Sequence, residues 1–273
     1  MTTSKRLSAA LLIAAGLALP GVVAGQQREH AASGLGLAIG IADFHQRDEY
    51  VSPVTFRAAI LSADALFEKR SGRMLHSIEA SFSVGHPNSA TLPRDDQQRV
   101  GRLAYSLLRA LGDPERRDGR LVLFLGGGLS TFGEVTVLDA SDATWNYTYR
   151  DWSWYWAHSV DLAARLEYAA AARSAAVRLA TPAVRLVSRP NNGKDFNAGN
   201  ERVSREWLRG LAGGKLTYPW NGPMLVGETD YRQRMSARLQ LRAAYDFTYA
   251  SSDRPRALAM YMHQLLVGFL WLP

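Results

Sequence analysis

The feature that most constrains the fold is an alternation of residue types with a period of two. In residues 236–249 every odd position is apolar or aromatic, and the even positions are mostly polar or charged. Residues 34–44, 73–84, 158–170 and 261–271 alternate in the same way. Because successive side chains of a strand point to opposite faces, these segments are predicted to be β-strands with one apolar face.

The N-terminus has the pattern of an export signal. Lys5 and Arg6 form a basic start, residues 9–19 are apolar, Pro20 ends the run, and small residues precede a cut after Ala24 or Gly25. An uncleaved anchor is the alternative, but this run is shorter than the roughly 20 residues that a spanning helix needs. We therefore predict a cleaved signal peptide over 1–24 and a single domain over 25–273.

Several chemistries are excluded by composition. The chain has no cysteine, so it has no disulfides and no thiolate catalysis. Its six histidines lack metal-ligand spacing, and Gly126-Gly127-Gly128 lacks the lysine and helix of a phosphate loop. No metal and no cofactor are expected. The net charge of +7 in an exported chain does not indicate a nucleic-acid partner.

Alternating strands occur in soluble sandwiches and in membrane barrels, so other features must separate the two. The predicted strands are long for a sandwich, aromatic residues gather at strand ends, and the last strand ends the chain. Short and long connections alternate, as they do in barrels with short turns on one side and long loops on the other. Both termini then lie on the same side, which requires an even strand number.

The turn signals predict ten strands; two more within 218–232 or within 135–156 would make twelve. The ten predicted ranges are 34–44, 53–69, 73–85, 98–111, 119–134, 157–171, 174–188, 206–218, 233–250 and 256–272. Residues 218–232 are predicted to be a long connection, because Pro219, Gly222 and Pro223 interrupt the alternation. Pro182 lies inside a predicted strand and indicates a bulge.

In its alternating strands, its export signal and its aromatic-rich last strand ending at Trp271, the chain resembles bacterial outer-membrane β-barrel proteins as a class. It departs from their usual C-terminal signal because its last residue is Pro273. The resemblance implies an all-β fold, a closed antiparallel up-and-down transmembrane barrel in the outer membrane of a Gram-negative bacterium. The implied partners are outer-membrane lipid, lipopolysaccharide and the barrel-assembly machinery; no oligomeric state is implied.

In such a barrel the apolar faces meet lipid and the polar faces line the interior. Seven residues are predicted to face lipid: Leu162, Leu166, Leu239, Leu241, Phe247, Val267 and Phe269. A charged network is predicted inside: Glu79, Asp161, Arg165, Glu167, Arg178, Arg185, Arg238, Arg242 and Asp246. A narrow barrel is filled by its own side chains, so these charges either pair as a plug or line a narrow, porin-like polar channel with an arginine-biased wall.

Two long connections, 135–156 and 189–205, are predicted to be extracellular loops. The first is dense in aromatic residues: Trp145, Tyr147, Tyr149, Trp152, Trp154 and Trp156. Two interpretations are open. These rings form a belt at the membrane interface, or residues 145–156 form a stacking platform for an extracellular ligand.

A lipid hydrolase or lipid A deacylase is a further alternative, because His76-Ser77 and His158-Ser159 place a base next to a hydroxyl. Adjacent strand residues point to opposite faces, however, so neither dipeptide can act as its own catalytic pair. The prediction is a structural or narrow-channel protein without enzymatic activity and without catalytic residues.

Overall fold

The computed structural model describes residues 33–48, 52–86, 97–112, 120–142, 147–189, 214–253 and 257–273. Within these ranges, the side chains of 48, 52–54, 120, 138–142 and 147–153 are outside the description. The predicted signal peptide, 1–24, lies outside the described residues. In the described part of the chain, no helix is long and apolar enough to cross a membrane.

Almost all of the described chain is β-strand. The strands are β1 (Ser33–Asp48), β2 (Ser52–Ser71), β3 (Met74–Gly85), β4 (Gln97–Ala110), β5 (Arg120–Asp142), β6 (Tyr147–Ala169), β7 (Arg173–Ser188), β8 (Lys215–Thr217), β9 (Met224–Arg234), β10 (Leu239–Ser252) and β11 (Leu258–Trp271). A single turn of 3-10 helix, η2 (Pro219–Asn221), lies between β8 and β9.

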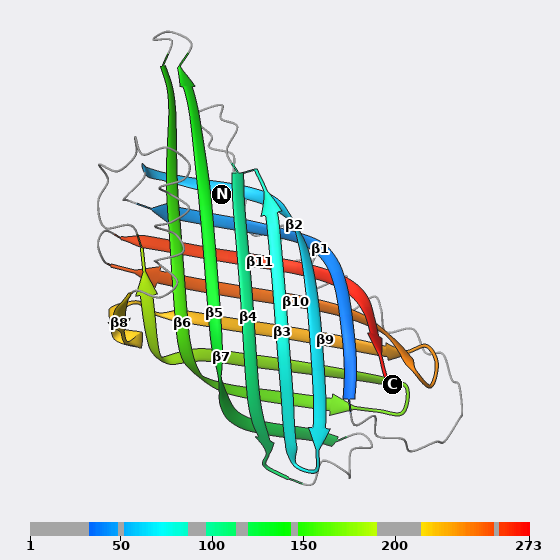
Figure 1. Ribbon diagram of the computed structural model, residues 1–273. Helices are drawn as coiled ribbons and strands as arrows, with labels where there is room; N and C mark the ends of the chain where they lie inside the picture. Colours follow the sequence, from blue (N-terminus) through cyan, green and yellow to red (C-terminus); the bar gives the residue numbers. More distant parts are fainter. Residues whose placement is uncertain are drawn as a thin grey trace, which may run out of the picture. The chain divides into compact units, whose positions relative to one another are not determined.

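The sheet closes on itself as an antiparallel barrel. Each strand from β1 to β7 pairs with the next, β7 pairs with β9, and β9, β10 and β11 follow in order. The ring closes where β1 pairs with β11, with Leu35 opposite Trp271. The short β8 pairs with β7 beside this ring, so ten strands form the wall (Figure 1). The predicted closed barrel of ten strands is confirmed.

The eighth wall strand lies where the sequence predicted a connection. Residues 206–213 of the predicted strand 206–218 lie outside the described residues; in its described part only Lys215–Thr217 is strand, and it pairs with β7 beside the ring and is not a wall strand. The wall strand is β9, whose residues 224–234 were assigned to the predicted connection 218–232 and to the strand after it. Pro219, Gly222 and Pro223 form the turn before the strand, and the alternation resumes directly after them.

The predicted strand 233–250 is therefore divided in two. A tight turn at residues 235–238 separates β9 from β10, with the amides of Met235 and Ser236 both donating to the carbonyl of Leu239, at 2.9 and 3.1 Å. The alternation of residue types continues through Ala237, which is why the turn was not visible in the sequence.

The predicted loop 135–156 is wrong for its described residues, because 135–142 continue β5 and 147–156 belong to β6. β5 and β6 stay paired as far as Asp142 opposite Tyr147. Their neighbours stop earlier, with Val137 as the last partner of β4 and Trp156 as the last partner of β7. The two strands accordingly project beyond the rest of the barrel (Figure 1). Valines and aromatic residues favour strands, which explains the extension.

Two local features of the wall follow from single residues. The register of β6 against β7 shifts between Val160 and Asp161, opposite Pro182, so the predicted bulge is confirmed. In β5, a Cβ at Gly126 would overlap the carbonyl oxygen of Leu107, and one at Gly128 would overlap that of Tyr105. These glycines let β4 and β5 approach closely.

The outer face of the wall is largely apolar, whereas the interior holds a group of buried charges together with buried apolar side chains. Ile39 on β1 is 75% exposed and Phe269 on β11 is 53% exposed, whereas Arg242 on β10 is 4% exposed. Of the seven residues predicted to face outward, four are exposed and three (Leu239, Leu241 and Phe247) are half-buried on the same faces. A soluble sandwich would bury these positions between two sheets, so the arrangement excludes a sandwich.

Candidate functional site

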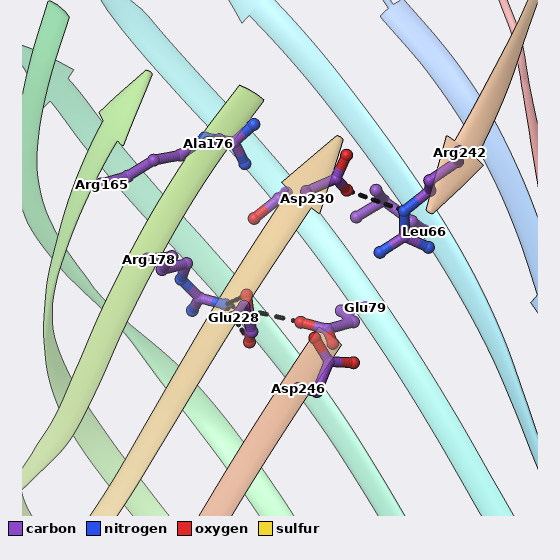
Figure 2. A pocket seen from close by; sticks show the side chains of 10 residues that line it. Leu66, Glu79, Arg165, Ala176, Arg178, Glu228, Asp230, Arg242 and Asp246 are labelled. Carbon is purple, nitrogen blue, oxygen red and sulfur yellow. Dashed lines mark hydrogen bonds and ion pairs between the residues drawn. The ribbon is translucent and has the colours of Figure 1, made fainter. Parts of the chain in front are cut away.

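Four charged residues from four strands meet in the middle of the barrel interior. The Arg178 guanidinium on β7 donates to both carboxylate oxygens of Glu228 on β9, at 2.8 Å. Arg102 on β4 donates to Glu228 at 2.9 Å and to Glu79 on β3 at 3.2 Å. Arg178 also lies 3.4 Å from Glu79. Each carboxylate therefore contacts both arginines, and Figure 2 shows Arg178 beside Glu228 and Glu79.

A second group of charges links β10, β9 and β2. Arg242 donates to Asp230 at 2.7 Å and also to Asp64 on β2. Arg232 donates to Asp230 at 2.8 Å and to Glu68 at 2.6 Å. The alternation of strand residues places Asp230 and Arg232 in this network, because both lie on even positions of β9.

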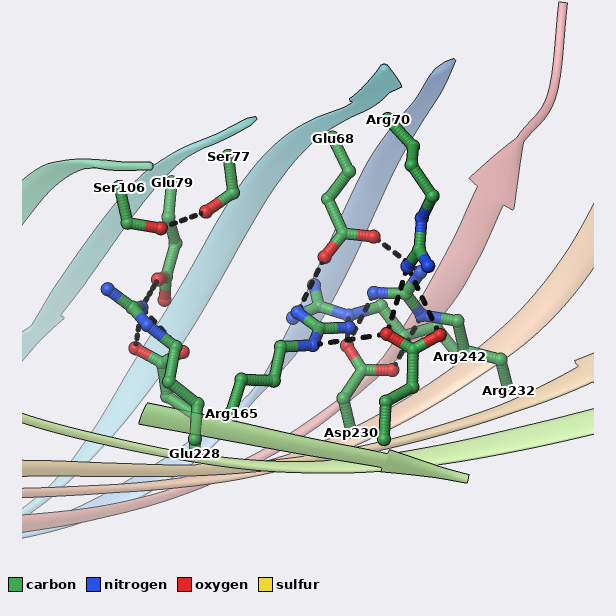
Figure 3. Close-up of polar contacts among 12 residues, drawn as sticks. Glu68, Arg70, Ser77, Glu79, Ser106, Arg165, Glu228, Asp230, Arg232 and Arg242 are labelled. Atoms are coloured by element: carbon green, nitrogen blue, oxygen red, sulfur yellow. Dashed lines mark hydrogen bonds and ion pairs between the residues drawn. The ribbon is translucent and has the colours of Figure 1, made fainter. Parts of the chain in front are cut away.

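This second group continues across the barrel to β6. Arg165 donates to Glu68 at 2.8 Å, and its Nε lies 3.6 Å from Glu167. Glu167 also accepts from Arg70, at 3.0 Å, and the Arg70 guanidinium lies 5.1 Å above the ring of Phe124. Figure 3 shows that these side chains reach toward one another from separate strands.

The charged region leaves little free space. A cavity of about 20 Å³ lies among Glu79, Arg165, Arg178, Asp230 and Asp246. A volume of this size holds about one water molecule. Buried charges are stable only when they are paired and hydrogen-bonded, and here acids and arginines alternate. Acids and arginines of opposite sign thus surround this cavity, which has room for about one water.

The barrel interior also contains buried neutral side chains. Ser62, Ser83 and Gln264 form one hydrogen-bonded triad, with oxygen–oxygen and nitrogen–oxygen distances of 2.8 to 3.2 Å. Between the charges and the end that carries the β5–β6 hairpin, the interior has an apolar layer, whose fully buried side chains include those of Phe44, Ile60, Phe132 and Met260. Beyond this layer, Gln46, Gln98, Glu134 and Thr136 form a buried hydrogen-bonded group.

The structure places eight of the nine predicted network residues inside the barrel: Glu79, Asp161, Arg165, Glu167, Arg178, Arg185, Arg242 and Asp246. The prediction for Arg238 is wrong. It lies exposed in the turn at 236–238, since the strand expected to hold it inside begins only at Leu239.

Sequence reasoning missed three interior residues on β9: Glu228, Asp230 and Arg232. All lay in the region assigned to a connection. A signal was present, because the even positions 228, 230, 232 and 234 are all charged. Four charges at a spacing of two indicate a strand with one charged face.

Arg185 has a different role from the other interior arginines. Its guanidinium donates to two backbone carbonyls, those of Gly222 at 2.5 Å and Ser251 at 2.9 Å. It also lies 6.0 Å above the Tyr155 ring. Arg185 thus fastens the connection around η2 to β7 and β10.

All described members of the predicted aromatic group lie on strand β6. Trp145 lies outside the described residues, and the side chains of Tyr147, Tyr149 and Trp152 are also outside the description. Trp154 is buried, and Trp156 stacks on His158 with ring centroids 6.4 Å apart.

The two His-Ser dipeptides are divided between the faces of the wall. Ser77 and Ser159 face inward and bond to Ser106 and Ser130, at 2.6 and 2.7 Å. On the outer face, His76 Nδ1 lies 3.1 Å from the Tyr105 hydroxyl. His158 Nδ1 lies 3.0 Å from Thr131 Oγ1 on that same face. No serine–histidine pair is formed by either dipeptide.

Among the described residues, no group of three acids or histidines is arranged to hold a metal.

Comparison with known proteins finds similarity in fold and not in sequence. No protein-family description matches the sequence, and no curated protein matches it. Among solved structures, the outer-membrane protease OmpT from Escherichia coli is similar with a TM-score of 0.53 and 6% identity, over 88% of this chain and 96% of that one. Neisserial surface protein A is similar with a TM-score of 0.39 and 9% identity, over 89% and 97% of the two chains. The Ralstonia pickettii toluene transporter TbuX has a TM-score of 0.34 and 7% identity, over 89% and 90%. The chain thus has the fold of a bacterial outer-membrane β-barrel.

Proposed function

We propose that the protein is an integral outer-membrane barrel whose interior is closed to ions and solutes. Its exposed apolar wall meets lipid, and its buried charges hold opposite walls together. The observation that carries this proposal is the interior itself, where paired charges surround a cavity of about 20 Å³. A hydrated ion needs a continuous water path, and this volume accommodates about one water.

The apolar layer of the interior supports the same conclusion. Phe132, 1% exposed, packs edge-on against Tyr155 with ring centroids 6.1 Å apart. A charged solute leaving the polar layer would have to cross this apolar layer unpaired, which is costly. Under this proposal the barrel acts as a rigid scaffold. The end that carries the projecting β5–β6 hairpin is then the surface that contacts a ligand or partner.

The other candidate functions receive less support from the geometry. A lipid hydrolase based on His76-Ser77 or His158-Ser159 lacks a paired nucleophile and base, because both serines face the interior. A ligand platform at 145–156 remains a proposal for the outer end of the hairpin, and it is compatible with a closed barrel.

Planar-bilayer recording tests the closure. The refolded wild-type barrel is expected to give no steady current steps under applied voltage. A matched variant removes two acids and two arginines together, Glu79→Ala, Arg102→Ala, Arg178→Ala and Glu228→Ala, which leaves the net charge unchanged. This variant is expected to pass more current than the wild type. Steady steps from the wild type would support the narrow channel instead.

A further inference from the structure

A stacked pair of aromatic side chains lies fully outside the barrel ladder, on the connection between β7 and β9. Trp220 is 76% exposed, and its ring stacks on Tyr218 with centroids 5.0 Å apart and planes 7° from parallel. Leu216, on β8, is 58% exposed. We refer to Leu216, Tyr218 and Trp220 as the aromatic foot.

The aromatic foot is held in a defined position. Leu216 pairs with Leu186 on β7, and the Asn221 amide donates to the Tyr218 carbonyl at 3.0 Å. Arg185 fixes the end of this connection by donating to the Gly222 carbonyl. Thr181 on β7 donates to the carbonyl of Met224, at 3.0 Å. Exposed apolar groups that lie next to one another, unlike singly scattered ones, generally mark an interaction surface.

The position of the foot points to lipid as its partner. β7 and β9 pair directly only as far as Ala180 opposite Val226, and beyond that point β8 and η2 occupy the space between them. The outward residues of the flanking strands are apolar: Leu179 on β7 and Leu225 on β9 are both exposed. The foot therefore continues the apolar outer wall at the end where the wall strands separate.

We propose that the aromatic foot inserts into the headgroup region of the outer leaflet and anchors the β7–β9 side of the barrel in the membrane. Tryptophan and tyrosine favour this zone because one part of each ring is apolar and the other part can hydrogen-bond. The inference rests on the proposed placement in the outer membrane. It assigns a lipid-binding role to a segment outside the ten-strand ring.

The absence of native cysteine permits a direct test. Trp220→Cys is labelled with an environment-sensitive fluorophore and refolded into phosphatidylcholine vesicles that contain a spin-labelled lipid, with the nitroxide near the headgroup or deep in the acyl chain. Two matched positions serve as controls: Ile39→Cys on the outer wall and Asp253→Cys at an exposed site near the end of β10. The label at 220 should be quenched strongly by the shallow nitroxide and weakly by the deep one.

The controls distinguish insertion of the aromatic foot from membrane placement of the whole barrel. Quenching at 39 with none at 220 would overturn the foot and leave the membrane placement intact. No quenching at 39 in a folded barrel would overturn the placement itself. Position 253 is expected to respond to aqueous iodide and little to lipid quenchers. If Trp220→Cys does not refold, Leu216→Cys is labelled instead and has the same expected result.

Discussion

The Arg165 guanidinium on β6 lies 2.8 Å from a carboxylate oxygen of Glu68 on β2, although β3, β4 and β5 separate these two strands in the wall. The contact therefore crosses the interior. Glu68 also accepts from Arg232 on β9, so one carboxylate joins three separate parts of the barrel. Such a contact has large consequences when it is broken, since it leaves buried charges without partners.

Removing Glu68 should destabilise the barrel strongly. Glu68→Ala leaves Arg165 and Arg232 buried without this acid, and breaking a buried pair costs about 3–5 kcal/mol. The matched control is Asp43→Ala, which breaks the exposed Arg57–Asp43 pair on the outer face at 2.7 Å; exposed pairs contribute about 0–1 kcal/mol. Equilibrium unfolding in urea measures both variants. An equal decrease in the free energy of unfolding for both variants would contradict the larger contribution assigned to the interior pair.

Interior and exterior apolar residues should respond differently to truncation. Phe132→Ala removes a fully buried ring and should cost about 3–5 kcal/mol. Ile39→Ala changes a side chain that is 75% exposed and should cost much less in detergent, where no protein cavity forms. The comparison uses denaturant unfolding in the same detergent. A larger loss of stability for Ile39→Ala than for Phe132→Ala would contradict the placement of Ile39 on the outer face and Phe132 in the interior.

The close approach of β4 and β5 should depend on glycine. Gly126→Ala and Gly128→Ala each place a Cβ against a backbone carbonyl, so the strands must separate, and overpacking of this kind costs about 1–3 kcal/mol. Gly227→Ala is the control, because its Cβ would lie 3.5 Å from the flexible Leu179 side chain. Folding yield and unfolding midpoint report the difference. Tolerance of alanine at 126 and 128 would contradict the described packing.

The long connection after β7 should be accessible from outside the cell. An epitope tag after Asn192, which lies outside the described residues, should be detected on intact cells. A tag after Gly72, in the turn between β2 and β3, should need permeabilisation, because that turn lies at the opposite end of the barrel. The reverse pattern would invert the topology and place the β5–β6 hairpin in the periplasm.

Much of the architecture was predictable because alternation depends only on local side-chain patterning. The closed ring, nine of its wall strands in outline and most interior charges follow from it. The errors arose where backbone geometry decides. The turn at Met235 retains an alternating sequence, and the strand after Pro223 begins directly behind residues that usually end strands. The partners across the interior, such as Glu68 and Arg165, were not predictable either, because ring closure and strand tilt determine which inward residues meet.

Ion flux per folded barrel in proteoliposomes tests the closed interior most directly. The amount of folded protein is determined by its heat-dependent mobility on gels, so that a silent sample is known to contain inserted barrel. The account predicts that the wild type leaks no more than protein-free vesicles, at any protein density. A leak that rises in proportion to the number of folded wild-type barrels would contradict it and establish an open polar path through the charged layer.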